Sequence, residues 1–447
     1  MKLRTFALIA AMSLFTALVL PVRPAAQEQK PTKPQQYTVT DLGALGGNNS
    51  VPQGINNRGQ VVGYAETPDT DPNCGCPVSH AFLWEKGMLH DLGTLGGRNS
   101  GAGLAGVNLE GQVVGSAQTP TVDPNNPPFL ESRAFLWEKG VMSDLGTLGG
   151  NDSSANAIGS EHRVVGGAQT GEPDPFFGQQ FHPFLWEEGV MTDLGTFGGP
   201  DGFAAGVNEV EQARNTTKTE GRRIQVVGAA NVGNTPIPPF TVPPFVAFLW
   251  ENGVMTNLGA LGGIESLAWA INDRSQVAGE FTFVDPTGNG ISHAFLWENG
   301  EMRDLGTVSG DSSSQAFALN KESQVVGGSG SGFIDDFTPV HAFLWQNGVL
   351  TDLNTLIPAN SGLQLIEAFG INARGQIVAC AFEFSTGNVH AVLLTPQHST
   401  STNQGTASAA PAEIAGRPRV ILSENVRNLL QMAIPGSGRF KARLNQK

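Results

Sequence analysis

The segments His80-Ala81-Phe82-Leu83-Trp84, Asp91-Leu92-Gly93-Thr94-Leu95-Gly96-Gly97 and Gly111-Gln112-Val113-Val114-Gly115 form a phrase that recurs along the chain in this order. Phe-Leu-Trp occurs six times before a degenerate copy at Val392, and a Val-Val-Gly-like segment occurs seven times. The Asp-Leu step also has seven copies, which begin at Asp41, Asp91, Asp144, Asp193, Asn257, Asp304 and Asp352. Repetition at about 50 residues indicates an array of equivalent structural units.

Each unit contains four short apolar runs of about four to six residues, and turn residues bound each run, which is typical of β-strands. Asn252-Gly253 and Asn299-Gly300 suit type I′ hairpins, in which both central residues need a positive φ. Asn56 and Gly59 occupy the first and fourth positions of a type I turn. Hairpins at both places predict four antiparallel strands per unit.

These features predict an all-β fold, a seven-bladed β-propeller of about 50-residue, four-stranded repeats. A linear β-solenoid is the main alternative, but its rungs are shorter and need no hairpin turns at both places. The first expected strand, 38–42, is a mid-unit segment, and the last, 391–394, is the segment that normally precedes it. We therefore expect these terminal strands to pair and close the propeller, which removes an exposed sheet edge.

Residues 1–26 are typical of a secretory signal peptide, with Lys2 and Arg4 before an apolar run and small residues at its end. A membrane anchor is the alternative, but the run of about 15 residues is short for a span of ~20. After cleavage we expect a secreted, periplasmic or extracellular protein without a transmembrane span. Residues 27–36 are expected to be a linker and 37–396 the propeller.

The last segment, 397–447, begins with a low-complexity linker and continues as a basic tail. Ser423 is a candidate helix N-cap, and Val426, Leu429, Leu430 and Ala433 share one face of a short helix. Such a helix is marginal alone, so we expect it to dock on the propeller.

Composition and charge limit the kinds of fold and function that this chain can have. The chain has 57 Gly, 28 Pro and only 15% charged residues, which favours a turn-rich β protein over a disordered chain. The net charge of −14 is unevenly distributed: 37–396 holds 14 basic and 37 acidic residues, and 397–447 holds seven basic and two acidic. An acidic body argues against nucleic-acid binding, which needs a basic surface.

Three cysteines are too few for a disulfide framework. Cys74 and Cys76 flank a single glycine and could form a small disulfide in an exported protein. Cys380 is expected to be a buried apolar residue. No other ligand for a metal is evident near the pair, and no cofactor is expected.

The phrases His293-Ala294-Phe295-Leu296-Trp297 and Asp91-Leu92-Gly93-Thr94-Leu95-Gly96-Gly97 resemble the bacterial extracellular HAF-repeat family. The resemblance covers 37–396 and implies an exported repeat protein with a propeller fold. It implies no activity and no catalytic residues. Three copies depart from the phrase, with Arg133 and Val246 in place of His and Pro183 in place of Ala.

Residues that recur in every unit belong more readily to the scaffold than to one active site. The repeated Asp could form a carboxylate ring, but we expect each to cap its Gly-rich turn. The Trp of Phe-Leu-Trp are expected in the core. The repeated His are His80, His182, His293, His341 and His390. They could line a central channel and bind a metal, or they could pack between blades. The alternation of side chains along a strand favours packing between blades.

Antiparallel pairing places both tight turns at one end and the most variable segments at the other, where recognition is expected. These segments are 66–79, 118–132, 168–182, 229–246, 280–292 and 328–340. Several of these segments carry phenylalanine beside proline. These aromatic residues could form one exposed apolar patch, or each segment could fold over its own blade. The candidate binding residues are Phe129, Phe176, Phe177 and Phe240, with Phe245 nearby. Their aspartates, including Asp71, Asp123 and Asp174, could ligate Ca²⁺, although the spacing is unlike an EF-hand.

The leading hypothesis is an exported, non-enzymatic binding protein that contacts a protein or peptide partner through these segments. The chain contains no Gly-x-Ser-x-Gly, His-Glu-x-x-His or phosphate-loop pattern. The alternative is a propeller hydrolase or lyase with a metal in the central channel, and a purely structural envelope protein is a third hypothesis.

Overall fold

A computed structural model of the chain separates Met1–Pro34 from a second compact unit, Gln35–Lys447. Only the second unit is described, over 35–176, 178–210, 223–236, 242–286, 288, 290–331, 338–397, 420 and 422–432. The expected signal peptide and most of the two expected linkers therefore lie outside the described residues.

The described residues form 28 strands, one short 3₁₀-helix and one α-helix. In chain order they are β1 (Tyr37–Asp41), β2 (Ser50–Ile55), β3 (Val61–Thr70), β4 (Pro77–Glu85), β5 (Met88–Asp91), β6 (Ser100–Val107), β7 (Val113–Val122), β8 (Leu130–Glu138), β9 (Val141–Asp144), β10 (Ser153–Ile158), β11 (Val164–Asp174), β12 (Gly178–Glu187), β13 (Val190–Asp193), β14 (Gly198–Val210), β15 (Arg223–Val232), β16 (Phe245–Glu251), β17 (Val254–Asn257), β18 (Glu265–Ile271), β19 (Val277–Val284), β20 (Gly290–Glu298), β21 (Glu301–Gly306), β22 (Ser313–Leu319), β23 (Val325–Ser331), β24 (Thr338–Gln346), β25 (Val349–Asp352), η1 (Leu353–Thr355), β26 (Leu363–Ile371), β27 (Ile377–Glu383), β28 (Val389–Pro396) and α1 (Glu424–Met432).

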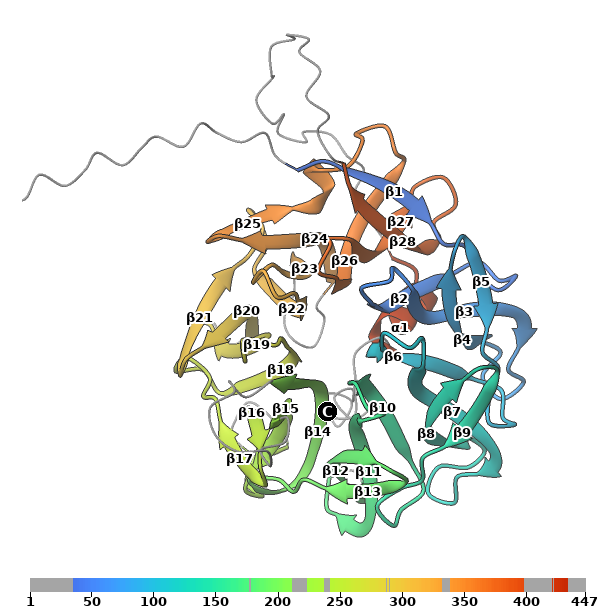
Figure 1. Cartoon of the computed structure of the whole chain (residues 1–447), viewed down its shortest axis with the longest axis vertical. Coiled ribbons are helices and arrows are strands. Elements are labelled where there is room, and N and C mark those ends of the chain that lie inside the picture. Colours follow the sequence, from blue (N-terminus) through green and yellow to red (C-terminus); the bar gives the residue numbers. More distant parts are fainter. Residues whose placement is uncertain are drawn as a thin grey trace, which may run out of the picture. The chain divides into compact units, whose positions relative to one another are not determined.

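The strands pair antiparallel in groups of four consecutive segments, as Figure 1 shows. The groups are β2–β5, β6–β9, β10–β13, β14–β17, β18–β21, β22–β25, and β26–β28 together with β1. Single-residue bridges join some neighbouring groups into larger sheets, between Ala157 and Ala105, Phe181 and Asp201, and Gly328 and Glu367. This organisation is typical of a β-propeller, and the expected all-β class is confirmed.

The innermost strand of each group contacts its neighbours in sequence, β2 with β6, β6 with β10, and so on to β22 with β26. β2 also contacts β26, β27 and β28. β1 pairs with β28, so that Tyr37 lies opposite Pro396 and Asp41 opposite Val392. The first and last strands of the described chain thus share one sheet.

The expected turn chemistry is present at both kinds of hairpin. Asn252 and Gly253 both have positive φ, 52° and 82°, which defines a type I′ turn. In the Asn-x-x-Gly turn, the Gly59 N–H donates to the carbonyl oxygen of Asn56 at 3.0 Å. The Asn56 side chain accepts bonds from the N–H groups of Arg58 and Gln60. These local bonds explain why the hairpins recur at the same positions.

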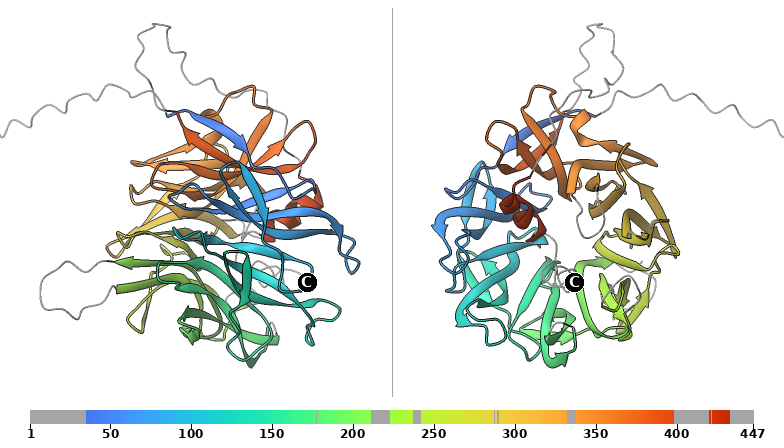
Figure 2. Two further views of the ribbon diagram at one scale, coloured as in Figure 1. Left: turned by 45° about the vertical axis from the view of Figure 1, so that its right-hand side comes forward. Right: turned by 180° about the vertical axis from the view of Figure 1, so that it is seen from behind.

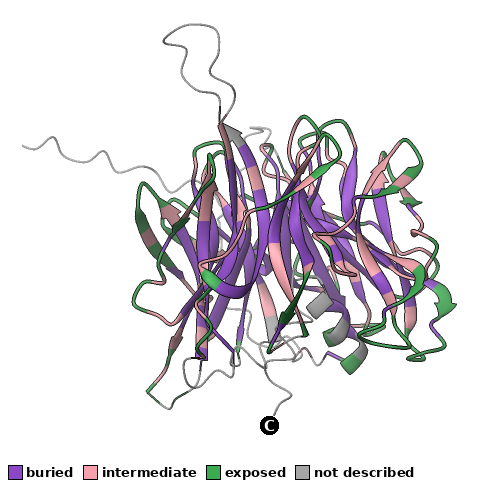
Figure 3. Ribbon diagram, turned by 90° about the horizontal axis from the view of Figure 1, so that it is seen from below, coloured by how far each residue is buried: buried purple, intermediate pink, exposed green. Residues whose placement is uncertain are grey.

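The glycine of Val-Val-Gly is required by close strand packing. At Gly63, an added Cβ would overlap the carbonyl oxygen of Val51 on the neighbouring strand. The repeated phenylalanine packs over the same place, since Phe82 is fully buried and its ring approaches Gly63. Buried residues follow the middle of the strands in Figure 3, and exposed residues gather at the turns. The repeated Phe therefore lies in the core in the six groups that carry it.

The Trp of Phe-Leu-Trp lie in or against the core, as expected. Trp345 is buried, and the other five are half-buried near the ends of their strands and pack against buried clusters. One expectation about the strands was wrong in detail: the second strand of a group is longer than expected, since β3, β7 and β11 span 10, 10 and 11 residues. The variable segments of these groups are therefore mostly extended hairpins with short tips.

The C-terminal helix α1 packs on the inner strands, beside β2 and β6 in Figures 1 and 2. The Val426 N–H donates to the Oγ of Ser423 at 3.3 Å, as expected of an N-cap. Val426, Leu429 and Leu430 are buried in one cluster with inner-strand residues, which we call the inner-strand cluster. Its members from the strands include Val51, Tyr64, Leu104, Phe203, Trp269, Phe317, Ile366, Phe369 and Cys380.

The Oη of Tyr64 donates to the carbonyl oxygen of Leu429 at 2.6 Å, which ties the last turn of α1 to β3. Ala433, the last residue of the expected apolar face, lies outside the described residues. None of the described helices is both long enough and apolar enough to cross a membrane.

Candidate functional site

Three neighbouring groups carry extended hairpins at the end of the strands away from the tight turns. These are β3–β4, β7–β8 and β11–β12, whose tips we call the hairpin-tip surface. Of the expected binding residues, Phe129 is 45% exposed and Phe176 is half-buried. Phe177 and Phe240 lie outside the described residues, and Phe245 is buried against Phe203, so it cannot belong to an exposed patch.

The β7–β8 tip is held by its own backbone. The Asp123 N–H donates to the carbonyl oxygen of Phe129 at 2.8 Å, and the Phe129 N–H donates to that of Asn126 at 3.0 Å. The Oδ1 of Asp123 accepts a bond from the N–H of Asn125 at 2.9 Å. The tip therefore presents Phe129 and the neighbouring Val122, which is 50% exposed, on an ordered turn.

The tip of β3–β4 meets the tip of β7–β8. The amide of Asn73 donates to the carbonyl oxygen of Pro128 at 3.4 Å, and a disulfide joins Cys74 to Cys76. Asp71 accepts bonds from the N–H groups of Asn73 and Gly75. The β3–β4 and β7–β8 tips thus contact each other rather than standing as separate loops.

One aspartate organises each tip. Asp71, Asp123 and Asp174 are all buried, and each accepts a hydrogen bond from an N–H two residues further along. This local capping is the expected behaviour of Asp in a turn and accounts for these carboxylates without Ca²⁺. Among the residues that the structure describes, no group of three or more His, Cys, Asp or Glu is arranged to hold a metal ion.

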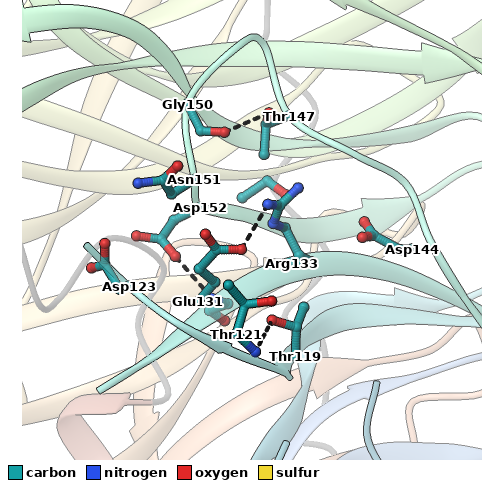
Figure 4. Close-up of polar contacts among 12 residues, drawn as sticks. Thr119, Thr121, Asp123, Glu131, Arg133, Asp144, Thr147, Gly150, Asn151 and Asp152 are labelled. Atoms are coloured by element: carbon teal, nitrogen blue, oxygen red, sulfur yellow. Dashed lines mark hydrogen bonds and ion pairs between the residues drawn. The ribbon is translucent and has the colours of Figure 1, made fainter. Parts of the chain in front are cut away.

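Charged side chains support the base of the β7–β8 hairpin, as Figure 4 shows. Arg133 occupies the position of the repeated His, and its Nη2 lies 2.8 Å from Oε2 of Glu131. Asp152 accepts a bond from the Ser132 N–H at 2.8 Å. Burial raises the pKa of Asp152, and the charges of Asp123 and Glu131 add to the effect. The base of this hairpin is thus a region of negative potential with one compensating guanidinium.

Sequence reasoning missed a repeated His–Asp pair. His80 Nδ1 lies 2.9 Å from Oδ2 of Asp91, and the equivalent pairs are His182–Asp193, His293–Asp304 and His390–Asp41. In the first three pairs the Asp follows the His by 11 residues, and that constant spacing is the signal that could have revealed them. His341 differs, because it pairs with Asp311.

Each carboxylate in these pairs has two roles. One oxygen of Asp91 accepts a bond from the N–H of Gly93, so the expected turn cap is confirmed. Burial opposes ionisation of Asp91, but the bonds from His80 and Gly93 outweigh it and lower its pKa. The bond to Asp91 raises the pKa of His80. The Nε2 of His80 also lies 3.1 Å from the carbonyl oxygen of Arg98, in the segment that leads to the next group, which agrees with a His between groups.

The tight-turn end has a cavity of about 350 Å³. It is lined by the Asn-x-x-Gly turns and by aliphatic residues before them, such as Ile55 and Ile371. Side-chain amides join several of these turns, and among the described residues five asparagines each donate to the carbonyl oxygen of an asparagine in the next turn. These bonds run from Asn56 to Asn108, Asn208 to Asn272, Asn272 to Asn320, Asn320 to Asn372, and Asn372 to Asn56.

The sequence matches no family model and no curated protein. Solved structures similar to the chain include the β-propeller domain of the Trilobed protease from Pyrococcus furiosus, at 9% identity and a TM-score of 0.44, covering 78% of this chain and 97% of that one. An acylaminoacyl peptidase from Pyrococcus horikoshii matches at 10% identity in two crystal structures, with TM-scores of 0.41 and 0.44 and 78% of this chain covered. This chain spans about half the length of that peptidase, 52% and 51%. Similarities this distant carry no argument about function.

Proposed function

We propose that the four-stranded groups are the seven blades of a closed β-propeller, with β1 completing the last blade. The pairing of β1 with β28 and the contacts of β2 with β26 support closure. Two side-chain bonds support it as well: His390 pairs with Asp41 within the last group, and Asn372 of the last group donates to Asn56 of the first.

We propose that the protein is an exported, non-enzymatic binding protein that recognises a protein or peptide through the hairpin-tip surface. The observation that carries the proposal is the ordered β7–β8 tip, which keeps Phe129 and Val122 exposed beside the disulfide-linked tip of β3–β4. Exposed aromatic residues on a rigid support are typical anchors of protein interfaces. Export rests on the signal-like residues 1–26 and on the resemblance to the HAF-repeat family.

The experiment is a pull-down from the cell envelope of the source organism, with captured proteins identified by mass spectrometry. Phe129→Ser and Val122→Ser should remove the partner, with a loss of affinity of about 2 kcal/mol or more at an anchor position. Val254→Ser is the matched control, because Val254 is 64% exposed but lies at a tight turn of another group. A partner captured equally by all three variants would exclude the hairpin-tip surface.

The hydrolase or lyase with a metal in the central channel stays a prediction. Metal analysis of the dialysed protein, together with unfolding in the presence of a chelator, tests it. Bound metal in stoichiometric amount, and loss of stability with the chelator, would favour an enzyme over a binding protein.

A further inference from the structure

A layer of buried polar side chains crosses the inner-strand cluster. Glu280 on β19, Gln315 on β22 and Glu367 on β26 come from three successive groups and are at most 8% exposed. Strand register places Gln315 and Glu367 at one level, since both lie opposite Gly328 on β23. Glu280 joins the same level through its hydrogen bond with Gln315. Polar groups at this depth are costly unless they are paired.

Not every polar atom of this layer has a hydrogen-bond partner. Glu280 accepts bonds from the Nε1 of Trp269 at 3.3 Å and from the Nε2 of Gln315 at 2.7 Å. The Oε1 of Gln315 is buried and has no hydrogen-bond partner. The carboxyl of Glu367 receives no hydrogen bond and no ion pair from any residue in the described part of the chain. The amide oxygen of Gln315 and the carboxyl of Glu367 therefore receive no hydrogen bond from the described residues, and both lie in the same layer as Glu280.

No positive charge from the described residues compensates these carboxyls. The charge of Glu265 acts on Glu280, and the charge of Glu280 acts on Glu367. The charge of Glu367 in turn acts on Tyr64 and Cys380. Burial raises the pKa of Glu280 to about 7, against the bonds from Gln315 and Trp269, and the charge of Glu265 adds to the rise. Burial, with the charge of Glu280, raises the pKa of Glu367 to about 8.

Aromatic faces adjoin the layer on the same inner strands. The ring centroids of Trp269 and Phe317 are 6.2 Å apart, and those of Phe317 and Phe369 are 5.1 Å apart. Trp269 is also the residue that bonds Glu280. Carboxyl oxygens beside aromatic faces are the surroundings that ammonium and guanidinium groups prefer in proteins.

We propose that Glu280, Gln315 and Glu367 bind an organic cation, an alkylammonium or guanidinium group, within the inner-strand cluster. The cation neutralises the two carboxyls, and one of its N–H groups donates to the Oε1 of Gln315. The aromatic rings from Trp269 to Phe369 pack against its apolar part. This site is separate from the hairpin-tip surface and does not depend on the function proposed for it.

Two sources could supply that cation. One is an external amine or a basic side chain of another molecule. The other is the chain itself, because α1 packs in the same cluster through Leu429 and Leu430, and the 15 residues after α1 include four basic residues and no acidic ones. Those four residues are Arg439, Lys441, Arg443 and Lys447.

Calorimetric titration of the full chain with n-butylammonium and with n-butylguanidinium tests the proposal. We expect binding to be coupled to proton release, because a cation favours the ionised carboxyls. Below pH 7, affinity should therefore increase as pH is raised, by up to about tenfold per pH unit for each proton released. Titration in two buffers of different ionisation enthalpy counts the protons. Glu280→Gln and Glu367→Gln should each weaken binding at least about tenfold. Glutamine is isosteric with a neutral carboxyl, so these variants should remain folded.

Glu301→Gln is the control, because it removes the same charge from an exposed residue and should bind like the parent. A full-length variant with the four tail residues changed to Gln separates the sources. Tighter probe binding by this variant identifies the tail as the occupant, and unchanged binding identifies an external cation. The proposal is overturned if neither the parent nor the tail variant binds either probe, or if binding ignores Glu280→Gln and Glu367→Gln.

Discussion

His390 Nδ1 lies 2.7 Å from Oδ2 of Asp41, although 349 residues separate the two in the chain. The same contact is made within single repeats by His80 and Asp91 and by His293 and Asp304. A pair that is local elsewhere is thus assembled here from the first and last strands. It is a direct probe of whether β1 and β28 remain joined in solution.

The first prediction concerns the pH dependence of this pair. The bond to Asp41 raises the pKa of His390, and the bond from His390 lowers the pKa of Asp41. The contribution of His390 is complete below the pKa of free His, about 6.5, and is lost as pH rises through its raised folded pKa. The contribution of Asp41 is present above about 3.9 and is lost as pH falls.

His390→Gln should therefore lower the melting temperature most between about pH 4 and 6.5, and progressively less as pH rises through the raised folded pKa of His390. The effect should be about 1 kcal/mol or less, because the pair is partly exposed to solvent. His90→Gln is the control, since His90 is exposed and lies outside the repeated position. A difference from the parent that is constant across pH would contradict the pairing.

The second prediction tests the terminal strand. Tyr37 is 2% exposed, and its N–H donates to the carbonyl oxygen of Leu356 at 2.9 Å. Tyr37→Ala should lower the free energy of unfolding by about 3 kcal/mol or more, because it empties a buried aromatic site. Urea denaturation measures this, with exposed Val141→Ala as the control. Equal midpoints for the two variants would mean that β1 is dispensable.

The third prediction concerns the repeated glycine. Gly63→Ala places a Cβ against the carbonyl oxygen of Val51 and should cost about 1–3 kcal/mol of stability. Gly101→Ala is the matched control, because an added Cβ there meets only the Tyr64 side chain at ordinary contact distances of 3.6 Å and more. Denaturant midpoints that fall equally for both variants would show that the strand approach at Gly63 is not the cause.

The fourth prediction concerns α1. Tyr64→Phe removes the bond to the carbonyl oxygen of Leu429 and should weaken docking of the helix by about 1 kcal/mol. Val426→Asp places a charge in the inner-strand cluster and should release the helix fully. Amide hydrogen exchange should then become fast within 424–432 while β2 and β3 stay protected. Unchanged exchange in both variants would place the helix elsewhere in solution.

Much of the fold could be predicted because it depends on local chemistry. Asn252-Gly253 forms its hairpin through backbone preference alone, and Asp91 caps its turn with a neighbouring N–H. The extension of β3 and β7 into long hairpins could not be predicted, because polar and proline residues there form strands through pairing with a partner segment. The partial burial of most Trp of Phe-Leu-Trp could not be predicted either, since it depends on where each strand ends.

Some features of the candidate site could likewise be predicted from the sequence, and others could not. Exposure of Phe129 follows from Pro-rich sequence at a hairpin tip, whereas burial of Phe245 follows from its contact with Phe203 on another strand. The roles of Asp71, Asp123 and Asp174 as tip caps are visible only once the tips are built. Glu280 and Glu367 carried no sequence signal, because each occurs in one repeat only.

The amino-acid sequence by itself determined the repeat, the turns, the antiparallel strands and the glycine at each close approach, because these depend on residues a few positions apart. Tertiary structure alone decided that His390 meets Asp41, that α1 covers the inner strands, and that Glu280 and Glu367 share one buried layer. Those relations depend on register and on which strand faces the common cluster, and neither quantity is encoded in the spacing of residues along one strand.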